Sequence, residues 1–431
     1  MLTAEENDLL CRVEGAAPMG QIMRRHWLPA CMSEEVAEPD GAPARTRLLG
    51  EDLVVFRDSA GKLGVLGEHC PHRGASLAFG RNEDCGLRCL YHGWKFDTEG
   101  KVLDMTCEPE GRSLKAQFRH KSYPVREAGG FVWTYMGPAA EMRAFEPPAW
   151  APTPGTRISI VKIHTACNWA QVLEGSIDSA HSSSLHSTDM PMMAVDGAKA
   201  TTANWPRPST DRSPRIQIQQ TDFGFRYAAI RKPILNPETH NYIRVTLFVA
   251  PFTVLIPPND QYKLAQMLFP IDDENTMFYW IAWHETGGIA QDEWRKFCAA
   301  EVGVDLDANY RKIRTLDNRF LQDRAAMKRG NFTGIKGIPA QDMAMWESMG
   351  PIADRSNDYL GASDVAVSQF RRQMVAAAQQ MAAGGAALGT TEPRIPHAKL
   401  ASFEGIVAKT TDWHALGVSE EERRAVAVAA E

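Results

Sequence analysis

The stretch from Glu68 to Phe96, EHCPHRGASLAFGRNEDCGLRCLYHGWKF, contains the most informative residue spacing in the chain. It holds two short clamps, Cys70-x-His72 and Cys89-x-x-His92, with sixteen residues between them. Each clamp supplies one thiol and one imidazole, whereas zinc fingers of this composition usually pair like ligands within a clamp. An iron–sulfur centre with two thiolates on one iron and two imidazoles on the other needs the mixed arrangement. A zinc site is the alternative.

The residues around the clamps add to this pattern. A proline follows the first cysteine, HRG closes the first clamp and YHGWKF contains the second histidine. Together they resemble the Rieske [2Fe–2S] motif, which implies four cluster ligands: Cys70, His72, Cys89 and His92. Such a centre accepts single electrons from a flavin or ferredoxin partner. Cys85 and His69 lie outside the clamps. We predict that Cys85 is a structural thiol and that His69 is not a ligand.

Composition limits the class of protein. The chain has 431 residues, 44% of them hydrophobic and 23% charged, with a formal net charge of −6. These values are typical of a globular protein with more than one domain, and they argue against a nucleic-acid footprint. No apolar run approaches the roughly 18 residues that span a membrane, and the polar N-terminus is unlike a secretory signal. We expect a cytoplasmic enzyme.

The spacing of apolar residues and the positions of prolines divide the chain into three parts. Residues 1–26 have helical spacing and are expected to pack on the catalytic domain, 27–140 read as a small all-β module, and prolines mark the start of 141–431. The last part is strand-rich, with a hairpin predicted around the turn DDEN (272–275) and an Ala-rich helix over 363–383. A Gly- and Pro-rich linker then leads to a tail to which no element is assigned.

A second group of candidate ligands lies in NWAQVLEGSIDSAHSSSLH (168–186), whose spacing favours a helix. His181 and His186 are five residues apart, so an ideal α-helix would not direct both at one point, but a widened turn would. The alternative is that both histidines only make hydrogen bonds. With the first motif upstream, however, Asp178-x-x-His181-x-x-x-x-His186 resembles the mononuclear iron motif of Rieske non-haem iron oxygenases.

The family resemblance implies the rest of the site. Two histidines and one carboxylate bind Fe(II) and leave positions open for O2. The carboxylate comes from a downstream helix, and we predict Asp342 in GIPAQDMAMWESMGP over the competitors Glu347 and Asp354. Asp178 is then a bridge between His181 and a cluster histidine, His92, of a neighbouring subunit, which implies a homotrimer or stacked trimers. The implied fold is α+β, a small all-β Rieske domain plus a helix-grip (START-like) catalytic domain with a central antiparallel sheet.

Within the family, the chain is most similar to the phthalate dioxygenase group. Such enzymes add both atoms of O2 to an aromatic carboxylate, giving a cis-dihydrodiol, with electrons from NADH through a flavin/iron–sulfur reductase. Burying two carboxylates requires paired cations, and we predict Arg207 and Arg244 as the clamp, with Ser179 as a hydrogen-bond donor. A monooxygenase or O-demethylase, a diaryl-ether dioxygenase, and an electron carrier with a ligand-binding domain are the alternatives.

Overall fold

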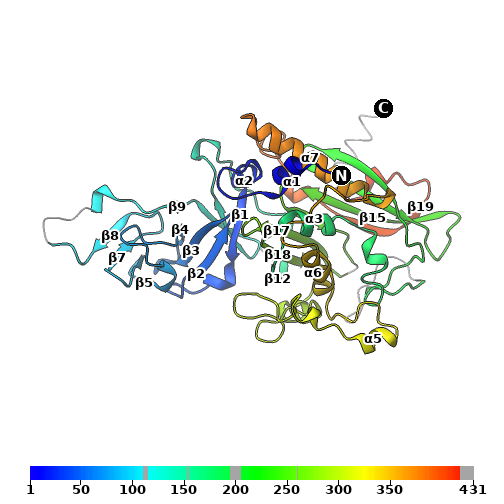
Figure 1. The fold of residues 1–431 in the computed structure, drawn as a ribbon, viewed down its shortest axis with the longest axis horizontal. Coiled ribbons are helices and arrows are strands. Elements are labelled where there is room, and N and C mark those ends of the chain that lie inside the picture. Colours follow the sequence, from blue (N-terminus) through cyan, green and yellow to red (C-terminus); the bar gives the residue numbers. More distant parts are fainter. Residues whose placement is uncertain (110–114, 152, 154, 195–204, 260, 418–431) are drawn as a thin grey trace. The chain divides into compact units, whose positions relative to one another are not determined.

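The structure is a computed structural model that describes residues 1–109, 115–151, 153, 155–194, 205–259 and 261–417 (Figure 1). The chain forms two compact units. The smaller unit is Val13–Glu146, and the larger unit combines Met1–Arg12 with Pro147–Glu431. Residues 1–26 are therefore divided: α1 (Ala4–Cys11) contacts α7 (Val365–Ala382) of the larger unit, and α2 (Pro18–Arg24) contacts β1 of the smaller one.

The smaller unit is built mainly from short antiparallel strands. Its strands are β1 (Trp27–Met32), β2 (Ala44–Leu48), β3 (Glu51–Arg57), β4 (Leu63–Gly67), β5 (Arg81–Glu83), β6 (Gly86–Arg88), β7 (Trp94–Phe96), β8 (Val102–Met105), β9 (Ser122–Tyr123), β10 (Val125–Ala128) and β11 (Phe131–Tyr135). They form the sheets β1-β11-β10, β2-β3-β4-β9 and β5-β6-β7-β8. The first clamp follows β4, and the second lies between β6 and β7.

The larger unit contains one antiparallel sheet of the order β12-β18-β17-β16-β15-β14-β13. Its strands are β12 (Arg157–Thr165), β13 (Arg215–Thr221), β14 (Gly224–Arg231), β15 (His240–Val249), β16 (Thr253–Ile256), β17 (Lys263–Pro270), β18 (Thr276–His284) and β19 (Phe403–Ala408). The predicted hairpin is present as β17 and β18, which pair antiparallel. β19 lies in the tail without an assigned element, and it pairs with the first half of β15. The predicted α+β class, with a central antiparallel sheet, is confirmed.

The remaining helices are α3 (Trp169–Ser176), α4 (Gln291–Phe297), α5 (Arg324–Lys328) and α6 (Ile338–Ser348). Asn168 caps α3 by accepting a hydrogen bond from the Ala170 N–H, and its amide group donates to the Cys11 and Asp273 carbonyls. Helices α3 and α6 contact each other closely at Gly175, where a Cβ atom would lie 2.0 Å from the Trp346 indole nitrogen. The absence of a side chain at Gly175 therefore allows this contact. Among the described residues, no helix is long and apolar enough to cross a membrane.

Candidate metal centres and pocket

The two clamps of the smaller unit lie on loops with the same main-chain hydrogen bonds. In each loop, the cysteine N–H donates to the carbonyl five residues later, and a glycine N–H donates back to the cysteine carbonyl, at 2.8 to 3.0 Å. The residues are Cys70 and Gly74 in one loop and Cys89 and Gly93 in the other. Both glycines have positive φ, 75° and 72°, in the left-handed region that glycine adopts without strain. The sequence therefore builds one loop conformation twice.

The clamp side chains form a set that fits a Rieske cluster. Cys70 and Cys89 are buried in the core of the smaller unit, and burial raises the pKa of Cys70 to about 11. The His72 and His92 rings are less buried, with centroids 4.4 Å apart, and the His72 ring stacks on Trp94. The buried Nδ1 of His72 has no hydrogen-bond partner among the residues that the structure describes. A buried nitrogen without a partner beside two buried thiols is the chemistry expected of metal ligands.

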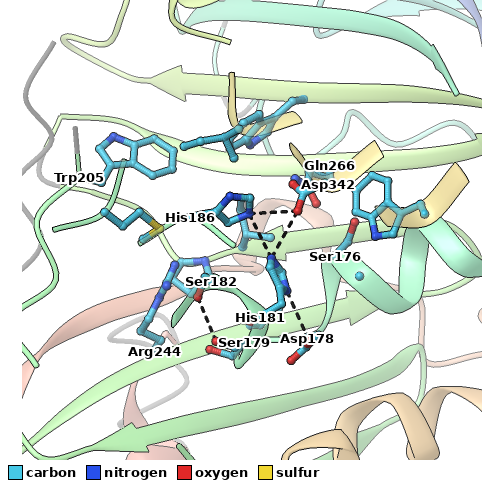
Figure 2. A pocket seen from close by; sticks show the side chains of 18 of the residues that line it. Ser176, Asp178, Ser179, His181, Ser182, His186, Trp205, Arg244, Gln266 and Asp342 are labelled. Atoms are coloured by element: carbon cyan, nitrogen blue, oxygen red, sulfur yellow. Dashed lines mark hydrogen bonds and ion pairs between the residues drawn. The ribbon is translucent and has the colours of Figure 1, made fainter. Parts of the chain in front are cut away.

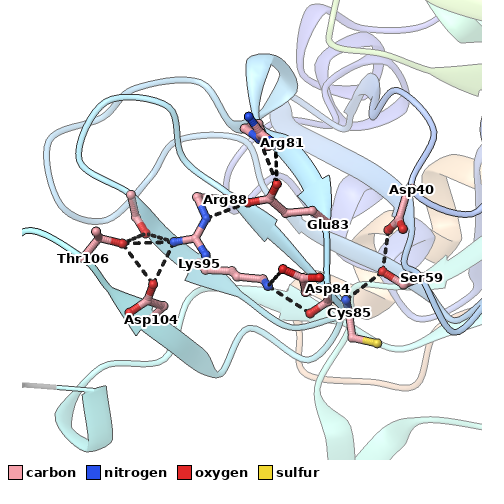
Figure 3. Close-up of polar contacts among 11 residues, drawn as sticks. Asp40, Ser59, Arg81, Glu83, Asp84, Cys85, Arg88, Lys95, Asp104 and Thr106 are labelled. Carbon is pink, nitrogen blue, oxygen red and sulfur yellow. Dashed lines mark hydrogen bonds and ion pairs between the residues drawn. The ribbon is translucent and has the colours of Figure 1, made fainter.

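A charged side chain supports each of these loops. Glu68, two residues before the first ligand, accepts a hydrogen bond from the Ser76 hydroxyl at 2.7 Å, across the base of its loop. Arg88, directly before the second cysteine, donates to the Gly93 carbonyl and to the Asp104 carboxylate, both at 2.8 Å (Figure 3). The loops are thus fixed by side chains that lie outside the ligand set.

Three side chains of the larger unit converge on one point. The two nitrogens His181 Nε2 and His186 Nε2 are 3.2 Å apart, and Asp342 Oδ1 lies 3.5 Å from the first and 3.0 Å from the second. Figure 2 shows the three groups pointing toward one another. His186 and Asp342 are buried. Although burial opposes it, the Asp342 carboxylate raises the pKa of His186. Two imidazoles and a carboxylate with atoms this close suit one ferrous ion.

The segment that carries the histidines is not the helix that the sequence spacing favours. Helix α3 ends at Ser176, and His181–Ser183 form a single turn of 3₁₀ helix. Short polar side chains form hydrogen bonds with main-chain groups here, in place of the hydrogen bonds of a helix. Asp178 Oδ1 accepts from the Ala180 N–H at 2.7 Å, and the Ser182 hydroxyl donates to the Ser179 carbonyl at 3.0 Å. The resulting irregular turn lets two histidines five residues apart meet.

Asp178 lies behind His181, on the side of the ring away from Asp342 (Figure 2). Its Oδ2 is 3.5 Å from His181 Nδ1, and 23% of its side chain is exposed. A carboxylate in this position orients the imidazole whose other nitrogen faces the metal. The Asp178 side chain is therefore only partly enclosed by the residues that the structure describes.

The converging ligands lie at a pocket with aromatic and charged walls. Trp205, Trp280 and Trp346 line it, together with Arg244 of β15. Arg244 is the sequence-predicted arginine that reaches this pocket, and its Nε lies 3.5 Å from Glu404 Oε2 on β19. A pocket that combines aromatic walls with one guanidinium suits a planar ring that carries a negative charge.

Two further arginines lie near the pocket. Arg207 is 1% exposed and donates to the hydroxyls of Ser183 and Ser182, at 2.8 and 2.6 Å. Arg231 donates to the Ser179 carbonyl at 2.7 Å. Burial, together with the neighbouring Arg244 and Arg231 guanidiniums, lowers the pKa of Arg207 to about 10. These guanidiniums are therefore close enough to repel one another.

The competing carboxylates have other contacts. Glu347 is buried against Lys312 Nζ at 2.6 Å and accepts from the Ala166 N–H. Asp354 is exposed, and its carboxylate accepts hydrogen bonds from the Ser356 N–H and the Asn357 side-chain amide. Of the three predicted candidates, Asp342 is the one beside the histidines.

Comparisons with known proteins agree with this geometry. A family model described as Rieske [2Fe-2S] domain matches residues 26–124, and one described as LigXa C-terminal domain like matches residues 134–431. The phthalate 4,5-dioxygenase oxygenase subunit of Pseudomonas putida is 58% identical over 414 residues, which cover 96% of this chain and 94% of the relative. The chain belongs to the Rieske oxygenase family. It is an oxygenase subunit with a Rieske [2Fe–2S] domain, and His181, His186 and Asp342 form its candidate mononuclear iron site.

More distant relatives share the scaffold of this Rieske oxygenase. The 3-chlorobenzoate-3,4-dioxygenase oxygenase subunit of Comamonas testosteroni is 35% identical, covering 96% of this chain and 97% of the relative. The terminal oxygenase of carbazole 1,9a-dioxygenase from Nocardioides aromaticivorans IC177 has a solved structure with a TM-score of 0.55 and 16% identity, covering 87% of this chain and 97% of that one. Such a low identity supports the fold alone.

Sequence reasoning missed two residues of this oxygenase that lie at the site, Glu404 and Gln341. Glu404 belongs to the charged group beside the pocket, together with Arg231, which the sequence pattern placed less well than Arg207 and Arg244. Gln341 contacts a histidine of the candidate iron site. The sequence could have indicated Gln341, because this residue directly precedes the predicted ligand Asp342 in QDMAMWE. It could not have indicated Glu404, because the place of that residue depends on the pairing of β19 with a strand far away in the sequence.

Proposed function

We propose that this Rieske oxygenase is the terminal component of a two-component dioxygenase that adds both atoms of O2 to phthalate or a closely related aromatic carboxylate. The product is a cis-dihydrodiol. The observation that carries the proposal is a pocket that joins the converging His181, His186 and Asp342 to an arginine, with two more arginines nearby. The 58% identity with the phthalate 4,5-dioxygenase oxygenase subunit of Pseudomonas putida supports the same substrate class.

The two metal sites divide the chemistry. Cys70, His72, Cys89 and His92 would hold the [2Fe–2S] cluster, and His181, His186 and Asp342 would hold Fe(II). When bound, the cluster supplies single electrons, and the mononuclear iron supplies a site for O2. The chain positions the aromatic ring beside the iron site and limits the access of water to it.

Electrons would reach the iron site from another subunit. Asp178 has one side against His181, and its exposed part would accept a hydrogen bond from His92 of a neighbouring protomer. A head-to-tail contact of this kind closes into a ring, so we propose a homotrimer or stacked trimers. A flavin/iron–sulfur reductase that oxidises NADH would be the partner in the cytoplasm.

The arginines would bind the carboxylates of the substrate. Arg244 reaches the pocket itself, and the Arg207 guanidinium is next to Ser182, which also lines the pocket. The Ser179 hydroxyl accepts a weak contact from Arg231 at 3.4 Å, so its own hydrogen remains available to an anion. Two adjacent carboxylates would offset the repulsion among the guanidiniums, and a neutral ring would not.

Replacing Arg244 with alanine should lower kcat/KM for phthalate by at least roughly 30-fold, because truncating one partner of a buried charge pair costs about 2 kcal/mol or more. Iron content should stay unchanged. Arg226→Ala is the matched control, since Arg226 is also a buried arginine of the same sheet but contacts Gln219 and main-chain carbonyls outside this pocket. Unchanged phthalate turnover in Arg244→Ala would rule out the anion clamp.

The decisive experiment is product analysis with ¹⁸O2, NADH, a phthalate-type reductase and a panel of aromatic carboxylates. A dihydrodiol that carries two labelled atoms supports the proposal. One labelled atom would instead identify a monooxygenase or an O-demethylase, and a 5,5'-dehydrodivanillate O-demethylase oxygenase subunit is 31% identical to this chain. Cluster reduction with no oxygenated product from any member of the panel would indicate an electron carrier.

A further inference from the structure

We propose that Gln341 is a positioning residue for the mononuclear iron site, because it fixes the tautomer and the orientation of His186 and connects that ring to the carboxylate of Asp189. The inference rests on the proposed role of His186 as an iron ligand. Gln341 and Asp189 lie outside the set of three metal ligands.

The contacts of Gln341 use all of its polar atoms. It lies on α6 and is 1% exposed. Its Oε1 lies 2.7 Å from His186 Nδ1. Its Nε2 donates to Asp189 Oδ2 at 2.8 Å and to the Ile335 carbonyl at 2.9 Å. An unsatisfied group in this buried position would be costly, so the network has one favourable arrangement.

This arrangement determines the protonation of the His186 ring. Both partners of the Gln341 nitrogen are acceptors, so the nitrogen must face them and the oxygen must face the histidine. The oxygen can only accept, and His186 Nδ1 therefore carries a hydrogen. The lone pair of the neutral ring is then on Nε2, the atom that lies 3.0 Å from Asp342 Oδ1 and 3.2 Å from His181 Nε2. The ring is held in the tautomer that can bind a metal through Nε2.

The two histidines have different supports. His181 Nδ1 faces a carboxylate directly, that of Asp178 at 3.5 Å. His186 Nδ1 faces a neutral amide, and the Asp189 carboxylate lies one hydrogen bond further away. The charge of Asp189 polarises the amide and so strengthens the hydrogen bond to His186. Gln341 also adjoins Asp342 on α6, so one helix places a ligand and the support of a second ligand.

The test is the metal affinity of protein stripped of its mononuclear iron, measured by titration with Co²⁺ and followed by visible absorption. Gln341→Leu should weaken Co²⁺ binding by about 10- to 100-fold, the usual effect of losing such a support. The [2Fe–2S] absorption should not change, which shows that the smaller unit is folded, and far-UV circular dichroism should show that the larger unit keeps its secondary structure. A wild-type affinity in Gln341→Leu would overturn the inference.

Gln171→Leu provides the matched control. Gln171 is also 1% exposed, and it donates to the Trp346 and Gly350 carbonyls and accepts from the Ala353 N–H without contacting a metal ligand. It should lower the unfolding temperature and leave Co²⁺ affinity unchanged. An equal loss of affinity in Gln171→Leu would reduce the effect of Gln341 to general destabilisation and overturn the inference.

A double variant tests the connection to Asp189. Gln341→Glu with Asp189→Asn exchanges the amide and the carboxylate. It keeps an acceptor for His186 Nδ1 and a donor between the two side chains, and it removes the hydrogen bond to the Ile335 carbonyl. Co²⁺ affinity should return to within about tenfold of wild type. No recovery relative to Gln341→Leu would count against the network. His186→Ala separates the two levels of the argument, since wild-type Co²⁺ affinity in that variant would disprove the iron site itself.

Discussion

Asp178→Asn should slow electron transfer between the two metal centres by roughly 100-fold while both centres stay loaded. The substitution keeps the shape of the side chain, and its oxygen can still accept from the Ala180 N–H, so the turn is preserved. It removes the negative charge that would lie between two metal-bound imidazoles. Loss of a group that hydrogen-bonds to a metal ligand lowers activity by up to about 100-fold.

The measurement for Asp178→Asn is a single turnover. The reduced protein is mixed with O2 and phthalate, and reoxidation of the cluster is followed by its visible absorption. Three irons per chain should be found in both the variant and the wild type. Asp354→Asn makes the same chemical change at an exposed carboxylate bonded only to nearby residues among those described, and it should behave as wild type. Reoxidation at the normal rate in Asp178→Asn would disprove the bridge between subunits.

Asp342→Asn should abolish oxygenation and reduce the iron content from three per chain to two. An amide is a poor substitute for a carboxylate at a ferrous site, and the remaining two imidazoles would not retain the metal. The Rieske absorption should persist, because the cluster ligands lie in the smaller unit. Iron analysis, together with product analysis, gives the result.

Glu347→Gln is the comparison for this second prediction, because Glu347 was the nearest competing carboxylate in the sequence. It should keep the third iron and lose about 3 kcal/mol of stability, since Lys312 would be left buried without its partner. If Glu347→Gln lost the third iron and Asp342→Asn kept it, the assignment of the carboxylate ligand would be reversed.

Local sequence patterns were sufficient for parts of this fold. The two clamps lie on short loops whose conformation depends on nearby glycines, so their spacing and the residues around them were enough to show the resemblance to a Rieske motif. The hairpin of β17 and β18 joins neighbouring strands through a polar turn, and it too was predictable. In contrast, Asp342 was assigned by family resemblance, because no local pattern brings α6 to the histidines.

Other features depended on contacts between distant segments. The spacing of residues 168–186 favoured a helix, but competition from serine and aspartate side chains ends α3 at Ser176. The pairing of β19 with β15 brings Glu404 beside Arg244, although the two residues are far apart in sequence. The residue spacing of neither segment indicates that the two strands pair, so the position of Glu404 could not be predicted from the sequence.

The grouping of Arg207, Arg231 and Arg244 also has a consequence for the folding of the protein. Their mutual repulsion, balanced in part by Glu404, makes the substrate-free state carry unfavourable electrostatic energy in its interior. An anion that binds there stabilises the native state by mass action, because the unfolded chain does not gather these side chains. The substrate would thus act as a folding ligand for the enzyme that consumes it, and cells without substrate would hold the less durable form.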